Sequence, residues 1–140
     1  MIKNFFKIRE QDFTASFGLL FLRLVVGIAF IYHGWDKIQN PFGWIPAEAP
    51  LKVHSVFQFL AALSEFGGGI ALILGLLNSL TNIGIGFTML VAVYLHMIVL
   101  KDPFVNSKGG GSYELALVYL TISFLFFIIG PGKFSVDRYI

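Results

Sequence analysis

The chain has 140 residues, of which 56% are hydrophobic and 13% are charged, and its formal net charge at pH 7 is +2. Soluble domains are about 45–50% apolar and about 25% charged, so this composition excludes a soluble globular domain and indicates an integral membrane protein in contact with the lipid bilayer. The scattered basic residues exclude a nucleic-acid partner, and the absence of cysteine excludes disulfides, thiolate metal sites and thiol-relay chemistry.

The predicted elements are one interfacial segment followed by four apolar runs. A membrane-spanning helix needs about 20 mostly apolar residues, and Pro, Gly, Asn or Asp residues mark the ends of these runs. We expect an interfacial segment over residues 1–13 and spanning helices over residues 17–35, 55–77, 80–100 and 113–130. The first run resembles a signal peptide but is nearly of spanning length, so we expect it to be retained. The sequence therefore predicts one domain over residues 1–140, an all-α membrane protein with an up-down-up-down four-helix bundle.

Four spans would place both termini on the same side of the membrane. Three basic residues, Lys3, Lys7 and Arg9, cluster near the N-terminus. Because cytoplasmic segments of membrane proteins are enriched in Lys and Arg, we expect both termini of this multi-pass chain to be cytoplasmic.

A single carboxylate, Glu65, lies within the second apolar run. An acidic residue at the centre of a membrane helix costs roughly 2.5–3.5 kcal/mol, so it usually faces a partner or a cavity rather than lipid. Three glycines follow at residues 67–69, and their lack of side chains lets a neighbouring helix or a ligand approach closely. Glu65 is therefore the leading catalytic candidate, and Gly68 is a candidate for contact with a bound ring.

Arg23 is the natural partner for Glu65 if depth in the membrane is counted from the helix ends. It lies about three helical turns before the expected helix end at Trp35, and Glu65 lies about three turns after the expected helix start at Ser55. The two side chains would therefore be at nearly the same depth. We expect an Arg23–Glu65 ion pair, which would serve either as structural glue or as part of a site.

The remaining candidates cluster at the outer ends of the predicted helices. His33, Lys37, His96 and Glu114 all fall there, whereas the inner half is almost purely apolar. The two histidines are either boundary residues or binding residues, and Glu114 either stabilises its helix N-terminus or joins the site. Haem ligation by His33 and His96 is the less favoured alternative, and no spacing typical of a metal site is present.

Several segments together resemble the DoxX family of small four-helix membrane proteins. They are residues 22–24, 33–37, 65–76 (EFGGGIALILGL), 101–104, 110–114 and 130–137. The resemblance covers the chain from about residue 17 onward and implies a bacterial cytoplasmic (inner) membrane protein. Its relatives include a subunit of a thiosulfate:quinone oxidoreductase and proteins linked to oxidative stress or quinone detoxification. The positions that match the family are Arg23, His33, Lys37, Glu65 and Glu114.

The resemblance and the outer-half cluster together predict a redox-associated subunit that binds a quinone or a quinone-like small hydrophobic molecule. Glu65 would take up or release the proton with Arg23 as its charged partner, and His33 or Glu114 would connect Glu65 to the outer surface. His33, Lys37, His96 and Gly68 would contact the ligand. No intrinsic cofactor is evident, so a protein partner of a quinone-linked oxidoreductase would supply electrons. The alternatives are a non-catalytic scaffold that recruits a soluble redox or stress-response enzyme, and a small-molecule carrier that acts as a homo-oligomer.

Overall fold

The computed structural model describes residues 11–140, and over this range the regular elements are all helices. They are α2 (Phe13–Gln39), α3 (Ser55–Leu74), α4 (Asn78–Tyr94), the π-helix η1 (Leu95–Val99), α5 (Glu114–Ile129) and the short 3-10 helix η2 (Val136–Arg138). Helix α4 runs directly into η1. The interfacial segment expected over residues 1–13 falls almost wholly outside the described residues.

Three of the described helices are long and apolar enough to cross a membrane, namely Phe13–Gln39, Ser55–Leu74 and the continuous Asn78–Val99. The fourth, α5, is equally apolar but has 16 residues. At about 1.5 Å per residue it is about 24 Å long, somewhat shorter than the hydrocarbon core of a typical bilayer. The fold prediction is thus confirmed as far as an all-helical protein with four helices and three clear candidate spans.

Helix α2 is longer than predicted, because it begins at Phe13 rather than at residue 17 and ends at Gln39 rather than at residue 35. Asp12 caps its start by accepting a hydrogen bond from the Ala15 backbone nitrogen at 2.6 Å. At its other end the polar residues near Lys37 continue the helix to Gln39 instead of ending it. This extension changes the depth of every side chain counted from that end.

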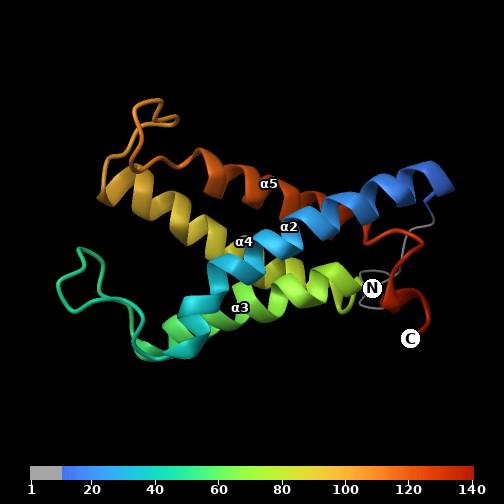
Figure 1. Cartoon of the computed structure of the whole chain (residues 1–140), viewed down its shortest axis with the longest axis horizontal. Coiled ribbons are helices and arrows are strands. Elements are labelled where there is room, and N and C mark those ends of the chain that lie inside the picture. Colours follow the sequence, from blue (N-terminus) through green and yellow to red (C-terminus); the bar gives the residue numbers. More distant parts are fainter. Residues whose placement is uncertain (1–10) are drawn as a thin grey trace.

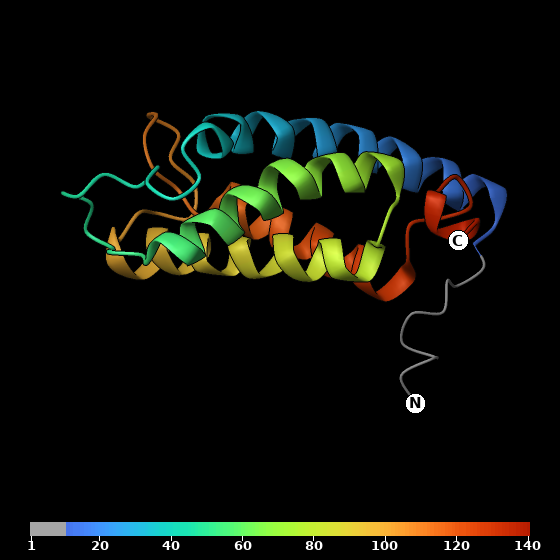
Figure 2. The same cartoon turned by 90° about the horizontal axis from the view of Figure 1, so that it is seen from below.

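The four helices form a bundle that is closed at one end and splayed at the other (Figures 1 and 2). The closed end, called the turn end here, contains the start of α2, the α3–α4 turn and the C-terminal segment 130–140. The loop end contains the two long connections, residues 40–54 and 100–113. Toward the loop end, the α2–α3 pair separates from the α4–α5 pair (Figure 1).

Glycines allow α2 and α3 to pack with their backbones nearly in contact. A Cβ atom added at Gly27 would lie 2.7 Å from the Gly69 carbonyl oxygen, and one added at Gly69 would lie 2.7 Å from the Gly27 carbonyl oxygen. Nearer the loop end, Gly34 faces the Phe66 backbone, where an added Cβ would lie 2.8 Å from the Phe66 Cα. Neither helix could hold this position with larger side chains, so these glycines set the α2–α3 register.

We expect Gly34→Ala to destabilise the fold by about 1–3 kcal/mol, since the new methyl group must push α2 away from the α3 backbone. The matched control is Gly18→Ala, because a Cβ at Gly18 meets nothing within 4 Å. Thermal unfolding of both variants in the same mild detergent measures the difference. Equal stability of the two variants would show that the α2–α3 contact is looser than the structure places it.

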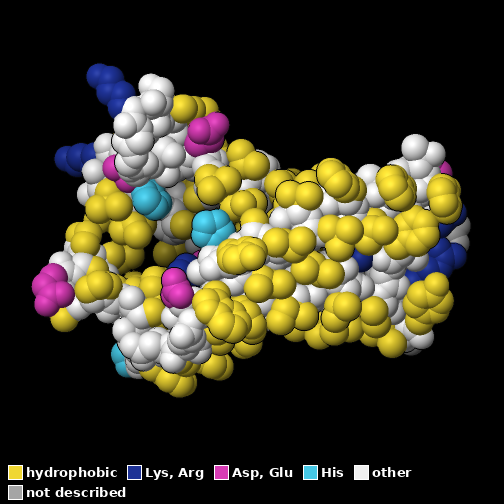
Figure 3. All heavy atoms as spheres, in the orientation of Figure 1, with side chains coloured by type: hydrophobic (Ala, Val, Ile, Leu, Met, Phe, Trp, Pro, Cys, Tyr) yellow, Lys and Arg dark blue, Asp and Glu magenta, His cyan; other side chains and the backbone are white. Residues whose placement is uncertain are grey.

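The interior of the bundle is small, and most large apolar side chains face outward. The larger buried hydrophobic residues form one cluster, consisting of Leu19, Val26, Phe30, Leu72, Ile85, Met89 and Phe126. Apolar side chains cover much of the outer surface along the helices (Figure 3). Phe21 and Phe87, for example, are 66% and 64% exposed. An exterior of this kind suits contact with lipid rather than water.

Arg23 stabilises the turn end of the bundle through hydrogen bonds to the backbone. Its guanidinium group is buried and donates hydrogen bonds to four backbone carbonyl oxygens at 2.6–2.9 Å, those of Leu72, Ile73, Pro131 and Phe134. Two of these acceptors belong to the last turn of α3, whose final carbonyl groups have no partner within the helix. The other two belong to the C-terminal segment, so Arg23 ties α2, α3 and this segment together.

The predicted Arg23–Glu65 ion pair is therefore wrong. Because α2 continues to Gln39, Arg23 lies more than four turns from the loop end of its helix, whereas Glu65 lies about three turns from the loop end of α3. This difference corresponds to about 9 Å along the helix axes. Arg23 instead reaches the carbonyl groups at the end of α3.

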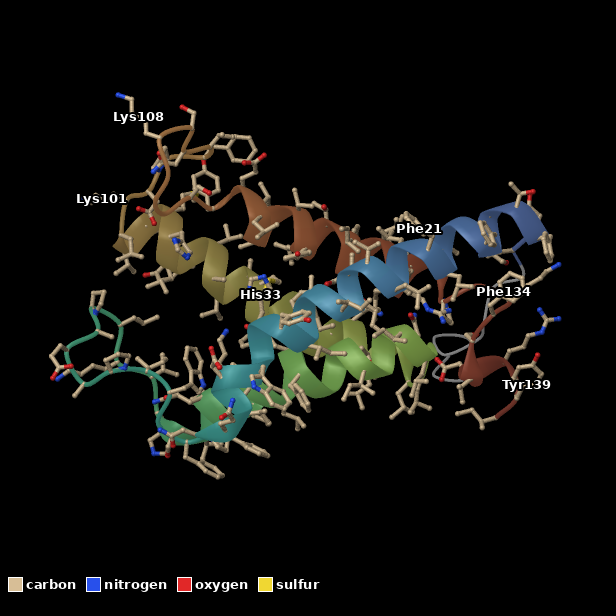
Figure 4. All side chains as sticks on the ribbon, in the orientation of Figure 1. Phe21, His33, Lys101, Lys108, Phe134 and Tyr139 are labelled. Atoms are coloured by element: carbon tan, nitrogen blue, oxygen red, sulfur yellow. The ribbon has the colours of Figure 1, made fainter. Side chains whose placement is uncertain are left out.

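Asp137 completes the turn end. Its two carboxylate oxygens accept hydrogen bonds from the backbone nitrogens of Leu77 and Asn78 at 2.6 and 2.7 Å. These nitrogens open α4, where a negative charge is favoured by the helix dipole. Phe134 and Tyr139 mark the position of this C-terminal segment in Figure 4. The turn end is thus held by polar contacts to the backbone, and the splayed loop end remains as the place for a site.

Candidate functional site

The partner of Glu65 is Lys37, at the loop end of α2. The Lys37 Nζ donates to both carboxylate oxygens of Glu65, at 2.7 and 2.6 Å. The Glu65 side chain is 4% exposed and the Lys37 side chain 25% exposed. The ammonium group also lies 4.6 Å from the ring centroid of Trp44, in a cation–π arrangement. The pair is therefore shielded from water on the Glu65 side and covered by an aromatic ring on the Lys37 side.

A cavity of about 500 Å³ lies beside this pair, between α3, α4 and the connection 40–54. Its walls are mainly aliphatic and aromatic side chains, namely Trp44, Ile45, Leu51, Val53, Phe57, Ala61, Phe87, Val91, Ala92 and Leu95. Its polar groups are the Lys37–Glu65 pair, Thr88 and His96. We call it the larger cavity.

Gln58 holds the connection 40–54 against the larger cavity. Its buried side chain accepts a hydrogen bond from the Ile45 backbone nitrogen and donates one to the Val53 carbonyl oxygen, both at 2.9 Å. The Gln58 backbone carbonyl oxygen accepts a hydrogen bond from the Trp44 ring nitrogen, also at 2.9 Å. Gln58 thereby holds Trp44, Ile45 and Val53, which are the two ends of the part of the connection that lines the cavity.

A second, smaller cavity of about 240 Å³ lies on the other side of the ion pair, between α2, α4 and α5. Phe30, His33, Met89, Ser112, Leu115, Ala116 and Tyr119 line it, together with Lys37, Glu65, Ala92 and His96. The last four residues line the larger cavity as well. The ion pair and His96 therefore form a polar partition between the two cavities.

The carboxylate of Asp102 holds the His96 side chain in place. Its Nδ1 atom lies 2.7 Å from Asp102 Oδ2, and the Asp102 backbone nitrogen donates to the His96 carbonyl oxygen at 2.8 Å. A carboxylate at Nδ1 favours the imidazole tautomer with hydrogen on that nitrogen and leaves Nε2 as the acceptor. His96 lies in the π-helical turn η1, a local geometry often found at functional sites.

Four of the predicted site residues meet at one place. His33, Lys37, Glu65 and His96 all line the smaller cavity. In Figure 4 the His33 side chain lies between α2 and the α4–α5 pair. Its ring is 6.2 Å from that of Tyr119 on α5, centroid to centroid. Figure 3 shows the loop end hollowed between its two connections, with acidic and histidine side chains nearby. The roles proposed for these residues remain predictions.

The structure does not bring the other predicted residues to these cavities. Arg23 belongs to the turn end, as described above. Glu114 is exposed at the start of α5 and lines neither cavity. Gly68 packs α3 against α4 instead, because a Cβ there would lie 3.1 Å from Ile85 Cγ1. A ring bound in either cavity would not need this glycine.

Sequence reasoning missed the pairing of Lys37 and the contribution of Tyr119 and Trp44. One signal for the pairing is present, since His33 and Lys37 are spaced at i and i+4 and must share a helix face. In the structure Gly34, three residues before Lys37, contacts α3, and this contact turns Lys37 toward Glu65. Trp44 is placed by long-range hydrogen bonds to Gln58, for which the sequence offers no comparable signal.

The cavities combine an apolar volume with a few convergent polar groups. A carboxylate, an ammonium group and an imidazole meet at their boundary, and a phenol faces the smaller cavity. Such a set can donate hydrogen bonds to ligand oxygens, accept them from ligand hydroxyl groups and exchange protons. The arrangement is typical of small-molecule sites, which are mostly apolar with a small number of placed polar groups.

Comparisons with known proteins identify the chain's relatives. The sequence model of the DoxX family matches residues 18–97. The inner membrane protein YqjF of Escherichia coli is 34% identical over 125 residues, which cover 86% of this chain and 90% of YqjF. A Bacillus subtilis protein named "Putative oxidoreductase CatD" is 26% identical over 123 residues, covering 88% of this chain and 87% of that protein. No solved structure matches the chain with significance. This chain belongs to the DoxX family of membrane proteins.

Proposed function

We propose that this protein is a redox-associated membrane subunit that binds a quinone or a quinone-like small molecule at the loop end. The single observation that carries the proposal is the Lys37–Glu65 pair at the boundary of the two mainly apolar cavities. A flat, apolar ring with oxygen atoms at its edge needs both features, an apolar slot and a few hydrogen-bonding groups at one side of it.

The larger cavity has a size and lining that suit such a ring. Its volume of about 500 Å³ lies within the range of roughly 300–1,000 Å³ common for small-molecule sites. Trp44, Phe57 and Phe87 supply aromatic surfaces against which a ring can stack. The relative CatD carries the word oxidoreductase in its name, which favours a redox role without identifying the ligand.

The polar partition would hold the edge of the ring. Lys37 can donate a hydrogen bond to a ring oxygen, and His96 can accept one from a ring hydroxyl group through Nε2. Glu65 would take up or release a proton, with His33 connecting it to the surface of the loop end. Reduction of a quinone to a quinol consumes two electrons and two protons, and a redox protein partner would supply the electrons. Arg23 has no part in this scheme.

The proposed function implies a defined arrangement of the helices in the membrane. All four helices would span the bilayer, with α5 extended to spanning length by the residues that flank it, Tyr113 and Gly130. Both termini would lie in the cytoplasm and the loop end would lie in the outer half of the membrane. The name of the relative YqjF supports placement in the bacterial inner membrane.

Binding of a short-chain naphthoquinone to the protein in lipid nanodiscs tests the proposal. We expect saturable quenching of tryptophan fluorescence, because Trp44 lines the larger cavity. The double variant Lys37→Met, Glu65→Gln removes the ammonium group that would donate to a ring oxygen and leaves no unpaired charge. A hydrogen bond to a charged group contributes about 1.5–3 kcal/mol, so affinity should fall by roughly tenfold or more.

The matched control is Asp36→Asn, since Asp36 is an exposed acid that neighbours Lys37 and lines neither cavity. It should bind the naphthoquinone as the unchanged protein does. Quenching that does not saturate, or that is the same in the double variant, would contradict the proposal. The scaffold that recruits a soluble redox enzyme, or the oligomeric carrier, would then be the better hypothesis.

A further inference from the structure

The larger cavity has exposed aromatic residues at its rim, and one of them lies well inside a membrane-spanning segment. Phe57 on α3 and Phe87 on α4 both line it and are 59% and 64% exposed. Phe87 lies more than three turns before the loop end of the span Asn78–Val99, about 18 Å along the helix axis. A half-exposed aromatic ring near the middle of a span faces lipid, so this side of the cavity lies next to the hydrocarbon core.

The α3–α4 contact explains why the cavity opens there. Toward the turn end the two helices touch through small residues, where a Cβ at Gly84 would lie 3.0 Å from Ser64 Oγ and one at Gly68 would meet Ile85. Toward the loop end, side chains of both helices line the cavity instead, and the smaller ones among them are Ala61, Thr88 and Ala92. The two helices separate toward the loop end (Figure 1), and the larger cavity lies between them there.

The smaller cavity has different surroundings. Ser112, Ala116 and His33 line it and lie at or near the loop end, where headgroups and water are found. His33 is exposed and Ser112 is half-buried in the connection before α5. The floor is apolar and buried, formed by Phe30 and Met89. This cavity therefore faces the membrane–water interface rather than the hydrocarbon core.

We propose that the loop end has two mouths with different access, one from the bilayer between α3 and α4 and one from water between α2 and α5. They meet at the partition formed by Lys37, Glu65 and His96. A ligand would enter the larger cavity laterally from the lipid, and protons would reach Glu65 through the smaller cavity. The ligand class that follows is a membrane-dissolved amphiphile with an apolar body and a polar edge, not a water-soluble solute.

The natural absence of cysteine makes the access routes directly measurable. Ala61→Cys places a thiol in the larger cavity and Ala116→Cys places one in the smaller cavity, with little change in volume. Each variant, in liposomes, is treated with a charged, water-soluble methanethiosulfonate reagent and, separately, with a lipid-soluble maleimide. The charged reagent should modify the Ala116→Cys variant faster by on the order of 100-fold, because ions enter a lipid-facing cavity poorly. The lipid-soluble reagent should modify both.

Equal rates of the charged reagent at both positions would overturn the two-mouth arrangement, as would failure of the lipid-soluble maleimide to reach the Ala61→Cys variant. The ligand assignment rests on the proposed function and is tested separately, by protection. A lipid-soluble naphthoquinone should slow maleimide labelling in the Ala61→Cys variant and leave the Ala116→Cys variant unchanged. Differential access of the two reagents without protection by the naphthoquinone would support the two separate mouths and contradict quinone binding in the larger cavity.

Discussion

Arg23→Leu is expected to lower the stability of the folded protein by about 3–4 kcal/mol, among the largest effects of a single substitution in this chain. The substitution removes this donor from four backbone carbonyl oxygens, and of these the Leu72 oxygen keeps a second donor, the Gly75 backbone nitrogen. An unsatisfied buried acceptor costs about 1–3 kcal/mol, and part of this cost is recovered because the arginine no longer has to be desolvated. Thermal unfolding in mild detergent, followed by size-exclusion chromatography, measures the loss.

Two further variants separate geometry from charge. Arg23→Lys keeps the charge but loses the planar fork that reaches α3 and the C-terminal segment at once, so it should recover only part of the stability. Arg138→Leu removes an exposed arginine from the same end of the bundle and should have little effect. Unaltered stability of the Arg23→Leu variant would show that Arg23 does not hold the turn end.

Lys37→Met is expected to destabilise the protein by about 3–5 kcal/mol, because it leaves Glu65 as a buried carboxylate without its partner. The double variant Lys37→Met, Glu65→Gln removes both charges and should be considerably more stable than the single variant. The comparison of single and double variants by thermal unfolding isolates the coupling between the two side chains.

The control for this comparison is again Asp36→Asn, which changes the charge next to Lys37 without touching the pair. Additive effects of the Lys37 and Glu65 substitutions would contradict the ion pair. They would indicate instead that Lys37 reaches toward the headgroups, as many lysines at helix ends do.

The sequence was sufficient to predict the helical architecture and the general location of the site. Long apolar runs separated by Pro, Gly and Asn determine the helices, and their bounds agree with the structure within about four residues when η1 is counted with α4. The ionisable residues at one end of these runs, His33, Lys37, Glu65 and His96, do line one cavity. The features that follow from local sequence patterns could therefore be predicted.

The partners of these residues were not predictable by the same means. A depth estimate depends on where a helix ends, and an error of about one turn at Gln39 displaced Arg23 enough to suggest the wrong partner for Glu65. The glycine contacts between α2 and α3 set the register that places Lys37 beside Glu65, and such a register arises from two helices together. The wall carrying Trp44 likewise depends on the long-range contacts of Gln58.

Photolabelling with an azidoquinone in lipid nanodiscs, followed by peptide mapping, tests the central claim most directly. The structure predicts that adducts concentrate on the cavity-lining segments of α3 and α4, residues 57–65 and 87–96, and that an excess of unlabelled quinone suppresses them. Adducts spread over the lipid-facing surface without competition, or concentrated at the turn end, would contradict a quinone site between the two connections of the loop end.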